Sequence, residues 1–178
     1  MAHTVGFICG SLREGSINRK LEDALAGHYG DAGFETRTLD LGHYNLPLYH
    51  GDLDEPEGLQ RLRDDMLACD GIVVVTPEYN GGLPPVLKNA VDWVSTKGKE
   101  PFGEAAWGVA ACTPGPLSGV VCMRGLALLL MRLGGRVCPT FVGVGGASEA
   151  FNAEGRLATS FAGSLASAQV AEMKALLP

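Results

Sequence analysis

The sequence predicts an α/β protein built as a three-layer sandwich, with a five-stranded parallel sheet between two layers of helices. Short apolar runs alternate along the chain with helix-length stretches of mixed polarity. The clearest of these runs are rich in β-branched residues and lack polar alternation, as in strands covered on both faces. With 46% hydrophobic residues among 178, the chain can bury one full core. We therefore expect a single domain over residues 1–178.

The N-terminal half of the chain supplies three strands and three helices of this sandwich. We expect strands at 4–9, 34–41 and 71–76, and helices at 17–29, around 59–66 and at 85–95. Ser16 can cap the first helix, and Gly30 can close it. Charged residues make the second strand more polar than the first, which predicts that it lies at an edge of the sheet. Pro84 and Pro85 suit the first turn of the third helix.

The C-terminal half continues the alternation. We expect strands at 106–112 and 137–144, a helix between them that ends near Leu133, and a final helix at 154–177. A long loop at 42–56 separates the second strand from its helix. The expected strand order is 2-1-3-4-5, which reverses between the first and third strands. Ligands of such sheets bind at this reversal, beyond the carboxyl ends of the strands.

Composition excludes several classes of function. Fourteen Lys and Arg against 20 Asp and Glu give a net charge of −6, so the sequence lacks the excess of basic residues that is typical of nucleic-acid-binding proteins. The longest strongly apolar stretch, 126–131, is far shorter than the ~20 residues of a membrane span. Five cysteines without a C-x-x-C pair indicate reduced, buried thiols. His43 and His50 lack metal-ligand spacing. We expect a cytoplasmic protein that binds no metal.

The loop after the first predicted strand has the composition of a phosphate site. Ser11, Ser16 and Asn18 offer short hydrogen-bonding side chains, and Arg13 offers a guanidinium. The helix that begins near Ile17 presents free N–H groups and the positive end of its dipole. Serine and asparagine also cap helices where no ligand binds, so the spacing alone leaves both interpretations open.

Single residues exclude three other phosphate motifs. A Walker A loop that starts at Gly10 would need lysine where Ser16 stands. No G-x-G-x-x-G follows the first strand, and a phosphatase loop built on Cys9 would need arginine in place of Gly15. The loop therefore suits one terminal phosphate held by hydroxyls, amides and a single arginine.

The loop after the third predicted strand suits a flat aromatic ligand. Pro77, Gly81 and Gly82 permit a backbone path that turns N–H groups inward, and Tyr79 offers a ring for stacking. A flavin ring needs such donors near N5 and O4 together with apolar support. A plain turn before a proline-initiated helix explains the same residues without a ligand. The loop 113–119 follows the next strand and is expected beside these two.

Taken together, the motifs resemble those of the NAD(P)H-dependent FMN reductases, a flavodoxin-like family that includes chromate, quinone and azo-dye reductases. The resemblance covers almost the whole chain. It is carried by Gly10-Ser11-x-Arg13-x-x-Ser16-x-Asn18-x-x-Leu21, by Asn45-Leu-Pro-Leu-Tyr49 with Asp52, and by Pro77-Glu-Tyr-Asn-Gly81 continuing to Leu87-Lys-Asn-Ala-Val-Asp-Trp93.

The resemblance implies an FMN cofactor and assigns its contacts. The phosphate is expected at Ser11, Arg13, Ser16, Ile17 and Asn18, and the ring at Pro77, Glu78, Tyr79, Asn80 and Gly81, with Thr113 and Gly115 on its far side. NAD(P)H would deliver hydride to flavin N5 and leave before a quinone, free flavin, azo compound or metal oxyanion such as chromate is reduced, in a ping-pong cycle. Because the cofactor carries this chemistry, no catalytic side chain is expected. The family also implies a homodimer or homotetramer.

Some residues depart from the family pattern or fit two roles. Ser118 stands where the family usually has glycine, and Ala127 where it commonly has arginine. The apolar stretch 126–131 fits deep burial or a homodimer surface. Arg13 and Lys88 can attract an NADPH phosphate, but Lys88 equally fits a solvated helix face. A flavodoxin-type FMN electron carrier and a flavin-free binding domain are the alternative functions.

Overall fold

The computed structural model describes residues 2–177 and contains a six-stranded sheet. The strands are β1 (Thr4–Cys9), β2 (Glu35–Thr38), β3 (Gly71–Val75), β4 (Ala106–Cys112), β5 (Arg136–Val137) and β6 (Val142–Val144). All pairs are parallel, in the order β2-β1-β3-β4-β5, with β6 also paired to β4. This confirms the predicted strand order and the flavodoxin-like α/β fold.

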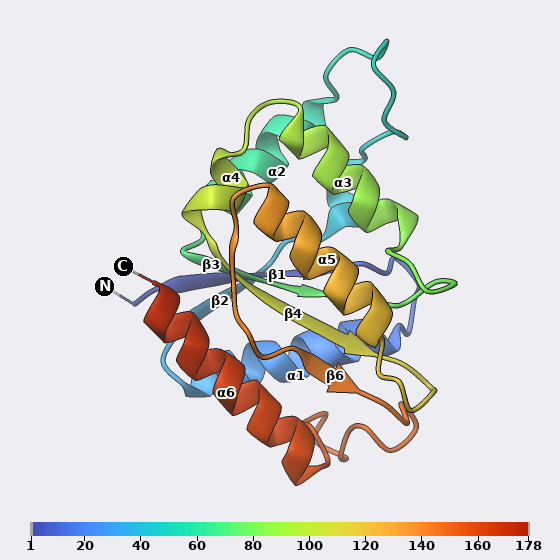
Figure 1. Ribbon diagram of the computed structural model, residues 1–178, viewed down its shortest axis with the longest axis vertical. Helices are drawn as coiled ribbons and strands as arrows, with labels where there is room; N and C mark the ends of the chain where they lie inside the picture. Colours follow the sequence, from blue (N-terminus) through green and yellow to red (C-terminus); the bar gives the residue numbers. More distant parts are fainter. Residues whose placement is uncertain (1, 178) are drawn as a thin grey trace.

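Helices cover both faces of the sheet (Figure 1). They are α1 (Ile17–Asp31), α2 (Glu57–Leu67), α3 (Pro85–Ser95), α4 (Glu100–Glu104), α5 (Val120–Arg132) and α6 (Ser160–Leu176), with a 3-10 helix η1 at Leu41–Tyr44. One layer consists of α1 and α6, and the other of α2, α3, α4 and α5. The sequence did not predict the short α4. Within residues 2–177, no helix has the length and apolar composition needed to cross a membrane.

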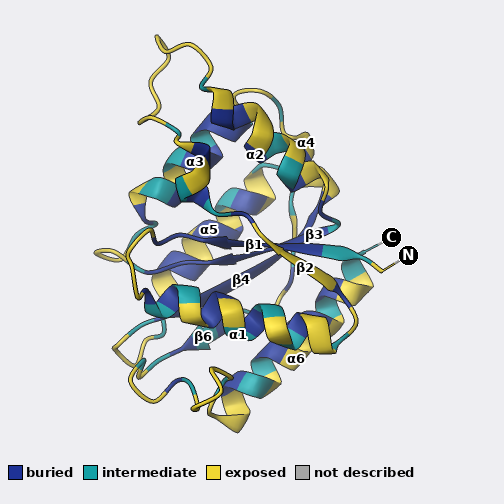
Figure 2. Cartoon of the chain, turned by 180° about the vertical axis from the view of Figure 1, so that it is seen from behind, coloured by how far each residue is buried: buried dark blue, intermediate teal, exposed yellow. Residues whose placement is uncertain are grey.

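Two-sided burial explains the unbroken apolar run of β3 (Figure 2). Val73 packs in the core under α1 and α6, whereas Ile72 and Val74 pack in the core under α2, α3 and α5. A strand with both faces covered needs no polar alternation. By contrast, all four residues of β2 are exposed, which confirms its predicted place at the edge.

The predicted helix starts are confirmed at two positions. The Ser16 side chain accepts a hydrogen bond from the backbone N–H of Asn18 at 3.2 Å, so α1 begins at Ile17. Pro85 occupies the first turn of α3, where its missing N–H costs nothing. These two starts fix how the loops after β1 and β3 enter their helices.

Two predicted boundaries are wrong because local side-chain caps intervene. The second strand ends at Thr38, not at residue 41, since the Asp40 carboxylate accepts the N–H of Gly42 and starts η1. The last helix begins at Ser160, not at 154. The Asn152 side chain accepts the N–H groups of residues 154 and 156, which holds this segment in a turn.

The predicted fifth strand, 137–144, is divided in two. β5 ends at Val137 and β6 begins at Val142, and both pair with β4. Pro139 lies in the break and has no N–H to give to the sheet. The fold class is unaffected, because β5 and β6 occupy successive parts of one edge.

Side chains of α6 fill this break in the edge. Gln169 is fully buried, and its amide nitrogen donates to the carbonyls of Val109 at 3.0 Å and Thr140 at 2.9 Å. Its oxygen accepts from the Tyr29 hydroxyl at 3.2 Å. The Glu172 carboxylate accepts from the backbone and hydroxyl of Thr140 at 2.8 and 2.6 Å. Helix α6 thus satisfies backbone groups that an uninterrupted strand would have paired.

Candidate functional site

Three loops meet at the carboxyl edge of the sheet, after the neighbouring strands β1, β3 and β4. Gly10 shows how closely the first two loops approach one another. A Cβ at Gly10 would lie 2.9 Å from Pro84 Cγ and 3.3 Å from Pro77 Cδ. A larger residue would push the loops apart, so this contact requires glycine. The predicted juxtaposition of the loops is present in the structure.

The first loop gathers hydrogen-bond donors around the start of α1. Ser11 and Ser16 are buried, and the exposed Arg13 guanidinium donates to the Gly15 carbonyl at 3.4 Å. Ile17 is the first residue of α1, so its N–H is one of the free amides of the first turn. Hydroxyls, amides and one guanidinium form a donor set that matches a phosphate.

Asn18, which the family resemblance assigns to the phosphate, has side-chain partners at the end of β4. Its amide nitrogen donates to the Cys112 carbonyl at 3.0 Å, and its amide oxygen accepts the Cys112 N–H at 2.8 Å. The side chain is 2% exposed. It therefore ties the first turn of α1 to the end of β4. No sequence signal marked this contact, because 94 positions separate the two residues.

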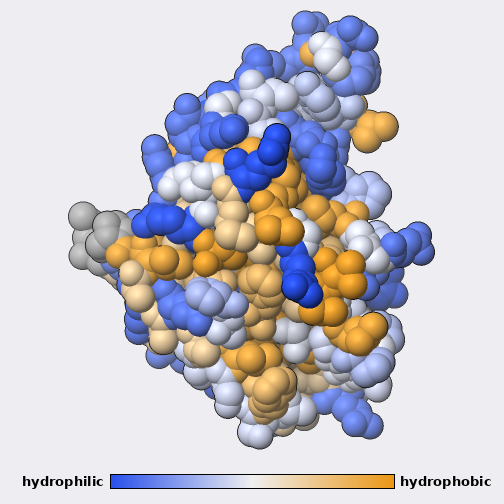
Figure 3. Space-filling model, viewed as in Figure 1, coloured by the Kyte–Doolittle hydropathy of each residue, from blue (hydrophilic) through white to orange (hydrophobic). Residues whose placement is uncertain are grey.

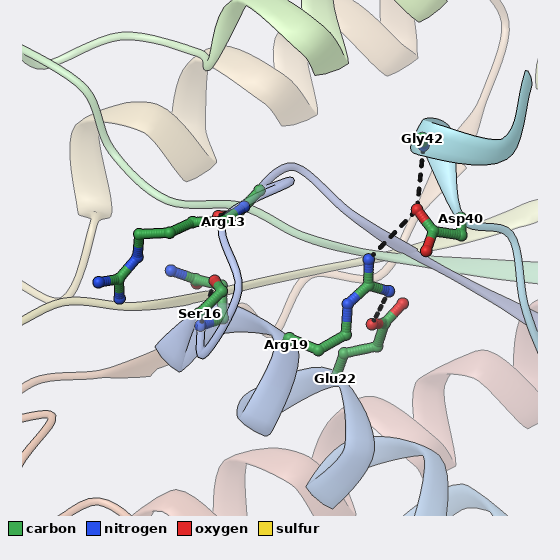
Figure 4. A network of polar contacts seen from close by, with 8 residues as sticks. Arg13, Ser16, Arg19, Glu22, Asp40 and Gly42 are labelled. Atoms are coloured by element: carbon green, nitrogen blue, oxygen red, sulfur yellow. Dashed lines mark hydrogen bonds and ion pairs between the residues drawn. The ribbon is translucent and has the colours of Figure 1, made fainter. Parts of the chain in front are cut away.

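A charge cluster built around the buried Glu22 lies beside the first loop (Figure 4). Arg19 pairs with Glu22 at 2.5 Å and with Asp40 at 3.4 Å. Burial raises the pKa of Glu22 to about 7, against the opposing effect of the Arg19 charge. In Figure 4 the Arg13 side chain points away from this cluster. Arg19 is therefore neutralised within the protein, whereas the guanidinium of Arg13 remains available to an anion.

The loop after β3 is a tight turn that presents an aromatic ring. Tyr79 and Gly82 exchange backbone hydrogen bonds of 3.1 and 3.0 Å. Between them Asn80 and Gly81 have φ of 53° and 74°, the pair of left-handed residues that Asn-Gly favours. The N–H groups of Tyr79 and Gly82 are used inside the turn, so they do not face a ligand. The Tyr79 side chain is 48% exposed.

Glu78 joins the second loop to the third. Its carboxylate accepts the backbone N–H of Cys122 at 2.9 Å. Cys122 is the third residue of α5, and the N-cap residue of that helix, Gly119, has no side chain to offer. Glu78 therefore caps α5 from another loop. The sequence placed Glu78 beside the flavin ring but did not reveal this cap, since 44 positions separate the partners.

The third loop is held by contacts of Thr113. The Thr113 hydroxyl donates to the Gly115 carbonyl at 3.1 Å, and its backbone N–H donates to Val144 at 3.0 Å. Ser118 has a φ of 54°, in the left-handed region that favours glycine. The departure from the family's glycine therefore falls on a strained position of this loop.

Helix α3 links the second and third motifs of the resemblance. Asn89 accepts the Tyr49 N–H at 2.8 Å, and the Trp93 ring N–H donates to the Pro47 carbonyl at 2.7 Å. These contacts hold the chain at 46–49 against α3. Lys88 lies on the solvent side, where its ammonium pairs with both oxygens of Asp92 at 2.7 Å. This pairing favours the solvated-helix interpretation of Lys88.

All five cysteines are free and buried, as the sequence predicted. Burial raises the pKa of the Cys9 thiol to about 11, and that of the Cys112 thiol likewise to about 11. Thiols of this kind are poor nucleophiles at neutral pH. Neither cysteine near the site is therefore suited to covalent chemistry.

Comparison with known proteins gives consistent matches. The sequence profile of the NADPH-dependent FMN reductase family matches residues 3–149. A 2-hydroxy-1,4-benzoquinone reductase of Burkholderia sp. is 40% identical over 110 residues, which cover 61% of this chain and 56% of that protein. A quinone reductase of Escherichia coli K12 is 32% identical over 142 residues, covering 76% and 74%.

Solved structures agree with the sequence matches. FerB, a flavoenzyme NAD(P)H:(acceptor) oxidoreductase from Paracoccus denitrificans, has a TM-score of 0.82 and 26% identity, with 99% of this chain and 100% of that chain covered. The chain spans only a little over half the length of the Burkholderia relative. The family profile nevertheless covers most of the chain, on a fold that FerB shares along its whole length. This chain belongs to the NADPH-dependent FMN reductase family.

Proposed function

We propose that this protein is an FMN-containing oxidoreductase that uses NAD(P)H to reduce quinones and related acceptors. One observation carries the proposal: a donor-rich phosphate cradle and an exposed tyrosine turn lie side by side at the strand-order reversal of the sheet. This is where open α/β sheets bind nucleotides. Membership of the FMN reductase family supports the identity of the cofactor.

The phosphate end of FMN would be held by the first loop. The hydroxyls of Ser11 and Ser16, the N–H of Ile17 and the guanidinium of Arg13 all donate, as a phosphate requires. The hydrogen bonds between Asn18 and Cys112 would hold the first turn of α1, and with it this loop, in place. Each charge-assisted hydrogen bond contributes about 1.5–3 kcal/mol.

The ring end would lie between the second and third loops. Pro77, Tyr79 and the turn at Asn80–Gly81 would form one wall, and Thr113 with Gly115 would form the other. Bound FMN would supply the hydride-accepting N5, and the chain would supply orientation and shelter from water. We therefore assign no side chain as a general acid, a general base or a nucleophile.

The two substrates would use the same exposed ring face in turn, which makes the cycle ping-pong. Quinones are the favoured acceptors because two of the relatives are quinone reductases. Free flavins, azo compounds and chromate belong to the wider range of acceptors that an open face admits. The competing function is an electron carrier that binds FMN without oxidising NAD(P)H.

Ligand titration tests the proposal with a matched pair of ligands. The wild-type protein should bind FMN, and Arg13→Ala should weaken FMN binding about 10- to 100-fold, since one charge-assisted contact is lost. Riboflavin lacks the phosphate, so its affinity should be unchanged by Arg13→Ala. Arg61→Ala, on the exposed side of α2, is the control for a lost positive charge.

Two outcomes would contradict the proposal. Failure of the wild-type chain to bind FMN would favour the flavin-free domain. FMN that binds but is bleached by neither NADH nor NADPH under anaerobic conditions would favour the electron carrier. Reoxidation of the bleached protein by a panel of quinones and other acceptors then defines the substrate range.

We also propose that the protein is a homodimer joined through α5. Leu126 and Leu130 are buried in the core, whereas Val121, Leu128 and Met131 are 54%, 66% and 51% exposed. Figure 3 shows apolar side chains gathered over this helix. The stretch 126–131 is therefore partly buried in the core and partly exposed, and its exposed side would form the homodimer surface. Exposed apolar side chains that gather on one helix are typical of a protein interface.

A further inference from the structure

We propose that Glu78 is a positioning residue that sets the reduction potential of the bound flavin, by fixing a carboxylate between the two loops assigned to the ring. The inference rests on the proposed FMN site and adds a determinant of which acceptors the site can reduce. It concerns a side chain that the family resemblance placed at the ring but that the structure turns toward α5.

The contact of Glu78 belongs to a crowded junction. The Glu78 carboxylate lies 2.9 Å from the N–H of Cys122. A Cβ built on Gly119 would lie 3.5 Å from Thr113 Cγ2 and 4.0 Å from Glu78 Cβ. The start of α5, the third loop and the Cβ atom of Glu78 therefore lie close together.

A second set of contacts makes this junction rigid. The Cys122 thiol donates to the Pro77 carbonyl at 3.4 Å and lies 3.5 Å from the Thr76 hydroxyl. Both Cys122 and Thr76 are buried. The first turn of α5 is thus bonded to the residues that directly follow β3. Glu78 cannot swing away without losing its backbone partner, so its charge has a fixed position.

The charge of Glu78 is balanced only by the helix end. The N-terminus of a helix carries about half a positive charge, which an ionised carboxylate more than neutralises. Among residues 2–177, no Lys, Arg or His nitrogen lies within 4.0 Å of this carboxylate. The ring would therefore face net negative charge where a bare helix end would be positive.

A negative charge near the ring opposes reduction, because two electrons add negative charge to the flavin. Glu78 would hold the potential low, which suits transfer to a broad range of acceptors. An amide in its place keeps an oxygen that accepts the Cys122 N–H but removes the charge. The charge and the cap can therefore be separated by substitution.

The experiment measures the midpoint potential of the FMN-loaded protein against a reference dye. Glu78→Gln should shift the potential to more positive values, with a melting temperature close to wild type. A tenfold change in the ratio of reduced to oxidised flavin corresponds to about 30 mV for a two-electron couple. Glu78→Ala should shift the potential in the same direction but should also lower the melting temperature.

The control variant is Glu104→Gln, which removes one negative charge at the opposite edge of the sheet, before β4. Its potential should equal that of the wild type. If wild-type protein binds FMN but Glu78→Gln leaves the potential unchanged or makes it more negative, Glu78 is only a helix cap and the inference is overturned, while the proposed function stands. If the wild-type protein binds no FMN, both fail together.

Discussion

Glu22 is a carboxyl group that folding removes almost completely from water. It is 1% exposed, and one of its oxygens has no hydrogen-bond partner among residues 2–177. The other oxygen pairs with Arg19. Burial is the largest influence and raises the pKa of Glu22 to about 7. The pairing with Arg19 therefore does not fully offset the loss of hydration.

Glu22→Gln should alter how stability depends on pH. Because the pKa of Glu22 is higher in the folded state than in the unfolded chain, the folded state retains a proton that the unfolded state loses. The free energy of unfolding should then fall by roughly 3 kcal/mol as the pH rises from about 4.5 to 7, because each unit of pKa difference contributes about 1.4 kcal/mol. The glutamine variant should lack this fall and be more stable than the wild type above pH 7.

Urea unfolding at half-unit steps from pH 5 to 8 measures the difference. Glu35→Gln, on the exposed strand β2, is the control and should keep the wild-type slope. An unchanged slope in Glu22→Gln would show that this carboxyl does not titrate on folding. The cysteine thiols contribute little below pH 8, because their ordinary pKa is 9.0 and burial raises the pKa of Cys9 and Cys69 further, to about 11.

At the scale of elements, α6 serves the sheet as well as the core. At the break between β5 and β6, the side-chain amide of Gln169 donates hydrogen bonds to the carbonyls of Val109 and Thr140. The hydroxyl of Tyr29 on α1 closes the same network. A single buried side chain therefore connects two helices and the edge of the sheet.

Gln169→Leu should destabilise the fold by about 3 kcal/mol or more. Several buried polar groups lose their partners, and each such loss costs about 1–3 kcal/mol. Chemical denaturation measures the total, and hydrogen exchange should show faster exchange of the β6 amides. Tyr29→Phe is the matched smaller change, with an expected loss of about 1 kcal/mol. A leucine variant as stable as the wild type would mean that water satisfies these groups.

The elements also show what local patterns can predict. The Ser16 cap and the Pro85 start are confirmed because capping acts within three or four residues. The fifth strand was predicted as continuous because its apolar residues extend across Pro139. The break depends on α6, which supplies replacement hydrogen bonds from about 30 positions away.

At the scale of the whole molecule, one face of α5 is exposed to solvent in the part of the chain that the structure describes. This helix lies in the layer opposite to α1 and α6 (Figure 1), and its exposed side chains are apolar at Val121, Leu128 and Met131. A symmetric pair of such faces would bury each patch against its copy. The proposed dimer would also cover the helix that Glu78 caps.

Leu128→Glu should weaken the proposed dimer by about 100-fold or more. Each dimer loses two buried leucine side chains, worth about 1.5–3 kcal/mol apiece, and gains two like charges. Sedimentation over a range of protein concentrations measures the change. Phe161→Glu is the control, because Phe161 is 70% exposed at the start of α6 in the other layer. A monomeric wild-type protein would contradict the proposal.

By itself, the amino-acid sequence determined the main alternation of strands and helices, the starts of α1 and α3, and the three loops at the carboxyl edge of the sheet. These follow from apolar periodicity and from residues that act on their immediate neighbours. Only the tertiary structure decided the partners of Asn18, Glu78 and Gln169. Their hydrogen bonds join segments far apart in the chain, and such contacts depend on how closely packed elements approach, which no local pattern specifies.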